Sequence, residues 1–414
     1  MRRQRDGDVG ASSTLREENF LNEKSKLPSL PRTLPEARAI DPFIVMDVMA
    51  EANARQAKGE YIIHMEVGQP ATPAPRAARE RARKALETER LGYTEALGMP
   101  ALRERIALYV KERYGARIGP ERVVVTAGSS AGFVLAFLAI LAPGDSLGLP
   151  SPGYPCYRQI LKALGLSPRL IETSDEGRWM PGAGDVDCLA AEDAAGILLA
   201  SPNNPTGTMV LGDRLAEIAA ACRRKGLWLI SDEIYHGLEY GAPAETALAH
   251  SDEAIVVNSF SKYFSMTGWR IGWLVVPEAL VRPIERLAQN IYICPPTISQ
   301  IAALGAFDGI DELEAIKGSY ARNRGMLLEE LSAAGLSDIL PADGAFYLYA
   351  DVSRFTDDSE AFAKAMLRDI GVAVTPGIDF DPDRGRSYMR LCYSGPEASM
   401  REAAVRIGAW LKKQ

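Results

Sequence analysis

Short apolar runs alternate with longer helical patterns through the middle of the chain. The apolar runs predict buried strands at 123–126, 146–149, 169–172, 196–200, 227–231, 255–259 and 273–276. Helical patterns lie between them, for example at 129–142, 155–164 and 212–225. Because strands that alternate with helices form parallel sheets, we predict an α/β fold. Its large domain would hold a mostly parallel seven-stranded sheet between helices.

The C-terminal part of the chain has a different pattern. A long helical run from about 296 to 334 precedes the apolar segment 345–349, which begins a second, mixed α/β region. A chain of 414 residues also exceeds what one compact core usually supports. We therefore expect a second, smaller α/β domain.

Polar side chains follow two of the predicted strands. The sequence Ser-Pro-Asn-Asn-Pro-Thr-Gly (201–207) follows one strand, and Ser-Asp-Glu-Ile-Tyr (231–235) follows another. Ligands bind at this edge of open α/β sheets. Asp232 would supply a fixed anion for a protonated pyridine nitrogen, while Asn204 and Tyr235 would donate to a phenolate oxygen. The alternatives are an ordinary turn and a helix N-cap at Asp232.

A single lysine, Lys262, follows the strand at 255–259. At the end of a buried strand it would be partly desolvated, which lowers its pKa and favours the neutral amine that attacks a carbonyl. Ser259, Ser261 and Arg270 surround it with hydroxyls and a forked cation that suit a phosphate ester. These groups indicate an aldehyde cofactor with a phosphate, for which pyridoxal phosphate is the candidate. The alternative is a surface lysine in a glycine-rich loop.

A further anion site is predicted where a strongly apolar helix begins. Ala127, Gly128, Ser129 and Ser130 follow the strand at 123–126 and open a segment that runs to Leu141. The first turn of a helix exposes free amide donors, which bind anions. The alternative is an ordinary helix start capped by Ser129.

In their order and spacing, these motifs resemble the class I/II pyridoxal-phosphate aminotransferases, the aspartate-aminotransferase-like group of fold type I. The resemblance covers about residues 35–412. It rests on these positions: Gly68 in Glu-Val-Gly-Gln-Pro, Tyr93 in Gly-Tyr-Thr-Glu-Ala-Leu-Gly, residues 127–131, Tyr154, Asn204, Asp232, Tyr235, Ser259, Lys262, Arg270, and Arg390 in Met-Arg-Leu-Cys-Tyr-Ser.

The resemblance assigns a role to each position. Lys262 would form the internal aldimine and shuttle the proton, with Asp232 at the pyridinium nitrogen and Tyr235 at the phenolate oxygen as the other catalytic residues. The remaining cofactor contacts would come from Gly128, Ser129, Ser130, Tyr154, Asn204, Ser259, Ser261 and Arg270, with Tyr93 from the neighbouring subunit. The substrate would be bound by Gly68, Asn204 and Arg390. From the residues alone, Tyr154 could be a turn residue and Arg390 half of a structural ion pair.

The function that the resemblance implies is a ping-pong aminotransferase, a transferase of nitrogenous groups. It would move an amino group between an L-amino acid and a 2-oxo acid, as a homodimer with shared active sites. A pyridoxal-phosphate C–S β-lyase is an alternative, and a non-catalytic regulatory module that senses the cofactor is another. The implied domains are a disordered extension at 1–30, an N-terminal arm and part of the small domain at 31–74, the large cofactor-binding domain at 75–305 and the small C-terminal domain at 306–414.

The composition of the chain argues against several other classes of protein. The formal net charge of −7 argues against nucleic-acid binding. Five cysteines without C-x-x-C spacing and three scattered histidines predict neither disulfides nor a metal site. We expect no membrane partner, because no apolar run is long enough for a membrane helix, and residues 1–30 lack a signal-peptide core. We therefore expect a cytoplasmic enzyme.

The sequence also indicates which amino acids the enzyme would prefer as donors. Relatives specific for dicarboxylates carry a second arginine shortly before a Pro-Pro pair, whereas here Gln289 is nearest that site. Aspartate is therefore not the expected donor. Phe43, Tyr292, Ile293 and Cys294 predict a medium-sized apolar pocket, suited to alanine, branched-chain, methionine or aromatic side chains.

Overall fold

The computed structural model describes residues 40–414, which form one compact unit. The expectations for residues 1–30 and for the start of 31–74 lie outside the described residues. The strands are β1 Ile63–His64, β2 Val123–Thr126, β3 Ser146–Ser151, β4 Ser167–Glu172, β5 Gly196–Ala200, β6 Trp228–Asp232, β7 Ile255–Ser259, β8 Gly272–Val275, β9 Tyr347–Asp351, β10 Val372–Ala373, β11 Thr375–Pro376 and β12 Tyr388–Cys392. The α-helices are α2 Ile44–Gln56, α3 Arg76–Thr88, α4 Pro100–Tyr114, α5 Gly128–Ile140, α6 Pro155–Ala163, α7 Ala183–Ala191, α8 Arg214–Lys225, α9 Glu278–Ile291, α10 Thr297–Ala306, α11 Ile310–Ala333, α12 Ser359–Ile370 and α13 Glu397–Leu411.

A seven-stranded sheet forms the centre of the fold, in the order β2-β8-β7-β6-β5-β3-β4. All pairings are parallel except those of β8, which runs antiparallel to both β2 and β7. The predicted α/β class and mostly parallel seven-stranded sheet are therefore confirmed. The largest differences in strand bounds are at β3, which extends to Ser151, and β4, which begins at Ser167.

Apolar side chains cover both faces of this sheet. In β2, Val123 and Val125 pack into one apolar cluster with α4, α7 and α8, while Val124 packs into another with α5, α6 and α9. Neighbouring residues of a strand point to opposite faces, so a strand buried on both faces is apolar throughout. This explains why the strands were visible in the sequence as continuous apolar runs.

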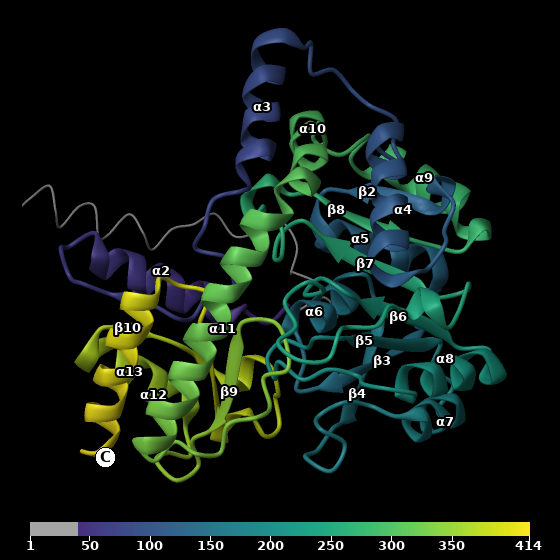
Figure 1. Cartoon of the computed structure of the whole chain (residues 1–414). Coiled ribbons are helices and arrows are strands. Elements are labelled where there is room, and N and C mark those ends of the chain that lie inside the picture. The colour runs from purple at the N-terminus through teal and green to yellow at the C-terminus, as the bar shows by residue number, and fades with distance from the viewer. Residues whose placement is uncertain (1–39) are drawn as a thin grey trace, which may run out of the picture. The chain divides into compact units, whose positions relative to one another are not determined.

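Two smaller sheets bring distant parts of the chain together. Strand β1 pairs in parallel with β10, with Ile63 opposite Val372, and β12 pairs antiparallel with β11 and β9. Helix α2, purple in Figure 1, also contacts β10. Residues from both ends of the described chain thus contribute to one α/β region, although the predicted domain boundaries at 74 and 305 stay a prediction.

The predicted helical run at about 296–334 consists of two α-helices, α10 and α11, with a 3-10 turn at Phe307–Gly309 between them. Gly309 packs so closely on the residue before α3 that a Cβ there would lie 2.6 Å from Pro75 Cβ. The 3-10 turn therefore ends at a glycine where no side chain fits.

Parallel pairing places three strand ends at one edge of the central sheet. Ala200 at the end of β5 is opposite Asp232 at the end of β6, and Asp232 is opposite Val257 in β7. Loops that follow these strands therefore meet. Within residues 40–414, no helix combines the length and apolar character required to cross a membrane.

Candidate active site

A cavity of about 300 Å³ lies at the carboxyl ends of β5 and β6. Segments from the whole length of the described chain line it, from α2 to β12. The predicted site residues on its wall are Gly68, Ser129, Ser130, Tyr154, Asn204, Asp232, Tyr235, Ser261, Lys262, Arg270 and Arg390.

The Lys262 side chain reaches into this cavity from the turn after β7. Its Nζ donates a hydrogen bond to the Gly68 carbonyl oxygen at 2.6 Å and lies 5.8 Å from the centre of the Tyr235 ring. Burial, with a smaller effect of the nearby cations Arg390 and Arg270, lowers the pKa of Lys262 to about 8. About a tenth of the amine is therefore neutral, and so nucleophilic, at pH 7.

Asp232 ends β6 and is only 2% exposed. Its carboxylate accepts hydrogen bonds from the Tyr157 hydroxyl and from the Ile234 backbone amide, the latter at 3.0 Å. Burial raises the pKa of Asp232 to about 6, against the effect of these hydrogen bonds. The group is therefore largely an anion at pH 7, held rigidly on the cavity wall.

Tyr235 faces the same cavity and is paired with another tyrosine. Its hydroxyl lies 2.7 Å from that of Tyr347, and burial raises the pKa of Tyr235 well above its ordinary value. The phenol therefore stays protonated and can donate. Gly68 permits this arrangement, because a Cβ at that position would overlap the Tyr347 hydroxyl.

Arg390 is a buried cation, 2% exposed, whose hydrogen bonds within residues 40–414 all go to uncharged oxygen atoms. Its Nε has no hydrogen-bond partner among these residues. One Nη donates to Asn204 Oδ1 at 2.8 Å, and the guanidinium lies between the Tyr347 and Phe380 rings. A buried charge is costly unless it is paired, so this position favours an anionic ligand.

A second candidate anion site lies at the start of α5. No side chain caps this helix, so the amides of its first turn, at Ser129 and Ser130, remain available. The Arg270 guanidinium lies beside them, where a Cβ on Gly128 would overlap it. Gly128 has φ +79°, which also favours glycine. Helix amides and a guanidinium together suit a phosphate.

Three predicted cofactor contacts, Gly128, Ser259 and Tyr93, do not line the cavity. Ser259 is 1% exposed, and its hydroxyl lies 2.8 Å from Ser261 Oγ and 3.0 Å from the Ile271 carbonyl oxygen, one layer behind the wall. Tyr93 is 82% exposed. Its loop is held from behind by the Thr297 hydroxyl, which donates to the Gly92 carbonyl at 2.6 Å.

The sequence did not identify Tyr157 or Tyr347 as site residues. Tyr157 lies in the first turns of α6 and Tyr347 begins β9. Both occur in apolar patterns that read as core, so only the contacts with Asp232 and Tyr235 reveal them. Of the predicted apolar pocket, Phe43 lines the cavity, together with Val45, Met46 and Met49 of α2, whereas residues 292–294 do not.

Residues 40–414 contain neither a cluster of metal ligands nor a disulfide. Among the described residues, no three histidine, cysteine or acidic side chains gather as a metal site would require. All five cysteines lie in the described part and are free thiols.

Comparisons with known proteins give a consistent result. The family described as aminotransferase class I and II matches residues 60–407. A valine–pyruvate aminotransferase of Mycobacterium tuberculosis is 47% identical over 381 residues, which are 91% of this chain and 97% of that protein.

Solved structures agree with these sequence relatives. An aminotransferase from Mycobacterium tuberculosis superposes with a TM-score of 0.90 at 46% identity, covering 92% of this chain and 100% of the other. Aspartate aminotransferase from Thermus thermophilus with maleate gives 0.86 at 30% identity, covering 91% and 99%.

Proposed function

The chain belongs to the aminotransferase class I and II family and is an enzyme that transfers amino groups, and we propose that it does so with pyridoxal phosphate attached to Lys262. Its substrates would be an L-amino acid and a 2-oxo acid, converted in two half-reactions of a ping-pong mechanism. The observation that carries the proposal is the buried Arg390 guanidinium, which binds only uncharged acceptors within residues 40–414, in the same cavity as the Lys262 amine and the Asp232 carboxylate.

The residues present fit this cofactor. The start of α5 with Arg270 would hold the phosphate, Asp232 would hold the pyridine nitrogen, and Tyr235 would donate to the phenolate oxygen. Tyr157 orients the Asp232 carboxylate by donating to it. When bound, the cofactor supplies an electron sink for the bond broken at Cα of the amino acid.

Two protein groups would then act on the substrate. Arg390 would bind the α-carboxylate through two parallel hydrogen bonds, with Asn204 holding the guanidinium in place. Lys262 would take the proton from Cα and deliver it to C4′ of the cofactor, and the second half-reaction would run this transfer in reverse. Its pKa of about 8 suits a base that works near neutral pH. Burial of the site excludes bulk water from both steps.

An apolar amino acid is the proposed donor. Phe43, Val45, Met46 and Met49 form one wall of the cavity, and Arg270 and Arg390 are the arginines among its described lining residues. With Arg270 at the phosphate and Arg390 at the α-carboxylate, neither is left for a side-chain carboxylate. The valine–pyruvate aminotransferase relative supports a valine-like donor and pyruvate as acceptor.

A half-reaction screen tests this proposal. The protein is reconstituted with pyridoxal phosphate, each amino acid is added alone, and the cofactor absorbance is followed. Valine or alanine should react at least about tenfold faster than aspartate, the discrimination expected of an apolar pocket. Aspartate as the best donor would contradict the apolar assignment. Release of pyruvate, ammonia and a thiol from a sulfur amino acid would indicate a lyase instead.

A further inference from the structure

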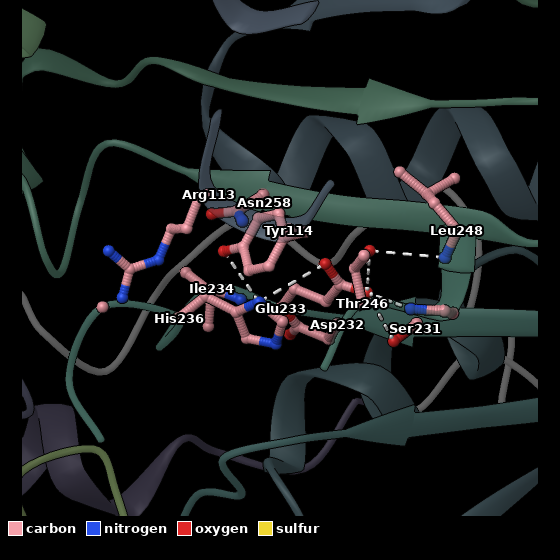
Figure 2. Close-up of polar contacts among 12 residues, drawn as sticks. Arg113, Tyr114, Ser231, Asp232, Glu233, Ile234, His236, Thr246, Leu248 and Asn258 are labelled. Atoms are coloured by element: carbon pink, nitrogen blue, oxygen red, sulfur yellow. Dashed lines mark hydrogen bonds and ion pairs between the residues drawn. The ribbon is translucent and has the colours of Figure 1, made fainter. Parts of the chain in front are cut away.

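The side chains that follow β6 point in two directions. Asp232 and Tyr235 line the cavity, whereas Glu233 and His236 turn away from it and are 2% and 3% exposed. Figure 2 shows Glu233 between His236 and Thr246. The Glu233 and His236 side chains therefore hold the backbone of Asp232 and Tyr235 from the side that faces away from the cavity.

The Glu233 carboxyl group is anchored by three donors. Its Oε1 accepts from the Ala247 amide at 2.9 Å, from Thr246 Oγ1 at 3.0 Å and from Ser231 Oγ at 3.2 Å. The Glu233 amide also donates to the Val257 carbonyl in β7 at 2.8 Å. A buried carboxyl group is costly to move away from such partners, so Glu233 fixes its own backbone tightly.

His236 extends this network to the end of α4. Its Nδ1 lies 2.9 Å from the Tyr114 hydroxyl and 3.5 Å from Glu233 Oε2. Tyr114 is the last residue of α4, a helix anchored in the core by other side chains. The turn that carries Tyr235 is thus tied at one end to β7 and at the other to α4.

Burial keeps both Glu233 and His236 uncharged near neutral pH. It raises the pKa of Glu233 to about 8 and lowers the pKa of His236 to about 4. The contacts are therefore neutral hydrogen bonds, and a glutamine at position 233 could reproduce most of them.

A second connection ties the same turn to the segment that carries Lys262. Glu239 accepts from Arg113 at 2.7 Å and from the Gly237 amide at 2.7 Å. A Cβ on Gly237 would lie 2.5 Å from the ring of Tyr263, which is the neighbour of Lys262. Arg113, near the end of α4, also lies 5.6 Å from the centre of the Tyr263 ring, so this end of α4 contacts both loops that carry the predicted catalytic groups.

We propose that Glu233, His236 and Tyr114 are positioning residues, which hold Asp232 and Tyr235 at the orientation required to bind the cofactor ring. They touch neither cofactor nor substrate, and they act through the backbone of residues 232–236. This inference rests on the proposed pyridoxal-phosphate site, and it adds residues to which the family resemblance assigned no role.

The test measures cofactor binding by the apo-protein in four variants. Tyr114→Phe removes one hydroxyl from the network and should raise the dissociation constant of pyridoxal phosphate about five- to tenfold, the effect of one neutral hydrogen bond. Glu233→Ala should raise it more, and Glu233→Gln should restore most of the loss. Tyr349→Phe is the matched control, because it removes a buried hydroxyl that has no partner among the described residues.

A second readout separates positioning from simple stabilisation. The pH midpoint of the bound cofactor's absorbance should shift in Tyr114→Phe and Glu233→Ala, because it reports on the ring environment set by Asp232, and should not shift in Tyr349→Phe. Wild-type affinity and midpoint in Tyr114→Phe would overturn the inference, even if its melting temperature fell. Failure of the wild-type protein to bind pyridoxal phosphate would instead overturn the proposed function.

Discussion

Two cations, Lys262 and Arg390, share one cavity, and neither forms a salt bridge within residues 40–414. Desolvation of a charge costs several kcal/mol. A ligand that supplies an anion to Arg390, or that forms a covalent bond with Lys262, would therefore stabilise the folded protein. Lys262 responds by a lowered pKa of about 8, whereas an arginine cannot lose its proton. Lys262 is therefore suited to act as a nucleophile and a base, and Arg390 to bind a carboxylate.

The Asp232 carboxylate is expected to be essential for turnover but not for folding. Asp232→Asn keeps the shape of the side chain and its contacts with Tyr157, but removes the fixed negative charge. We predict that kcat falls by roughly a hundredfold or more, as when a preorganised electrostatic group is removed from a buried site. Steady-state kinetics together with circular dichroism would check this. Near wild-type turnover would mean that Asp232 does not hold the pyridine nitrogen.

Cofactor attachment should depend on pH through Lys262. Only the neutral amine attacks an aldehyde, and its fraction falls about tenfold per pH unit below the pKa. We predict that the rate at which apo-protein is loaded with pyridoxal phosphate rises with pH up to about 8 and then levels off. Stopped-flow absorbance would measure it. A rate that keeps rising to pH 10 would indicate a lysine with an ordinary pKa.

At the scale of elements, the start of α5 is the most constrained feature of the site. Gly128→Ala would place a methyl group in the Arg270 guanidinium and force a positive φ on alanine. We predict a loss of about 1–2 kcal/mol of stability and weaker binding of pyridoxal phosphate, measured by thermal unfolding and calorimetry. Gly184→Ala is the control, since a Cβ there has open space. Equal effects of the two substitutions would contradict a phosphate site at α5.

Elements also show what the sequence can and cannot predict. The buried strands and the polar residues at their ends were visible because continuous apolar runs stop where the site begins, as at Asp232. The pairing of Ile63 with Val372 and the contact of Tyr157 with Asp232 depend on long-range packing that no local pattern encodes. Tyr347 was hidden for a similar reason, because an aromatic residue in an apolar strand reads as core.

The whole molecule leaves Tyr93 exposed on its own chain. An exposed Tyr93 is free to reach the phosphate site of a partner subunit, as the family resemblance implies. The homodimer itself stays a prediction, and so does the cytoplasmic location. Tyr93→Phe should weaken cofactor binding by about 1.5–3 kcal/mol, the value of one charge-assisted hydrogen bond. Equilibrium dialysis of the two proteins would measure this loss.

Mixing variants tests the shared site directly. A dimer of one Lys262→Ala chain and one Tyr93→Ala chain contains one site with both residues intact. Refolding the two variants together should therefore give more activity than the two give separately. A monomer in sedimentation at micromolar concentration, or no gain from mixing, would contradict shared sites and leave the role of Lys262 unaffected.

The covalent attachment of the cofactor is the central claim, and borohydride reduction followed by peptide mapping tests it most directly. Reduction converts the bond between a lysine amine and the cofactor aldehyde into a stable secondary amine, which mass spectrometry locates. We predict a single pyridoxyl group on Lys262, and none in Lys262→Ala, which should still bind the cofactor non-covalently. A pyridoxyl group on another lysine, or none on the wild-type protein, would contradict this account.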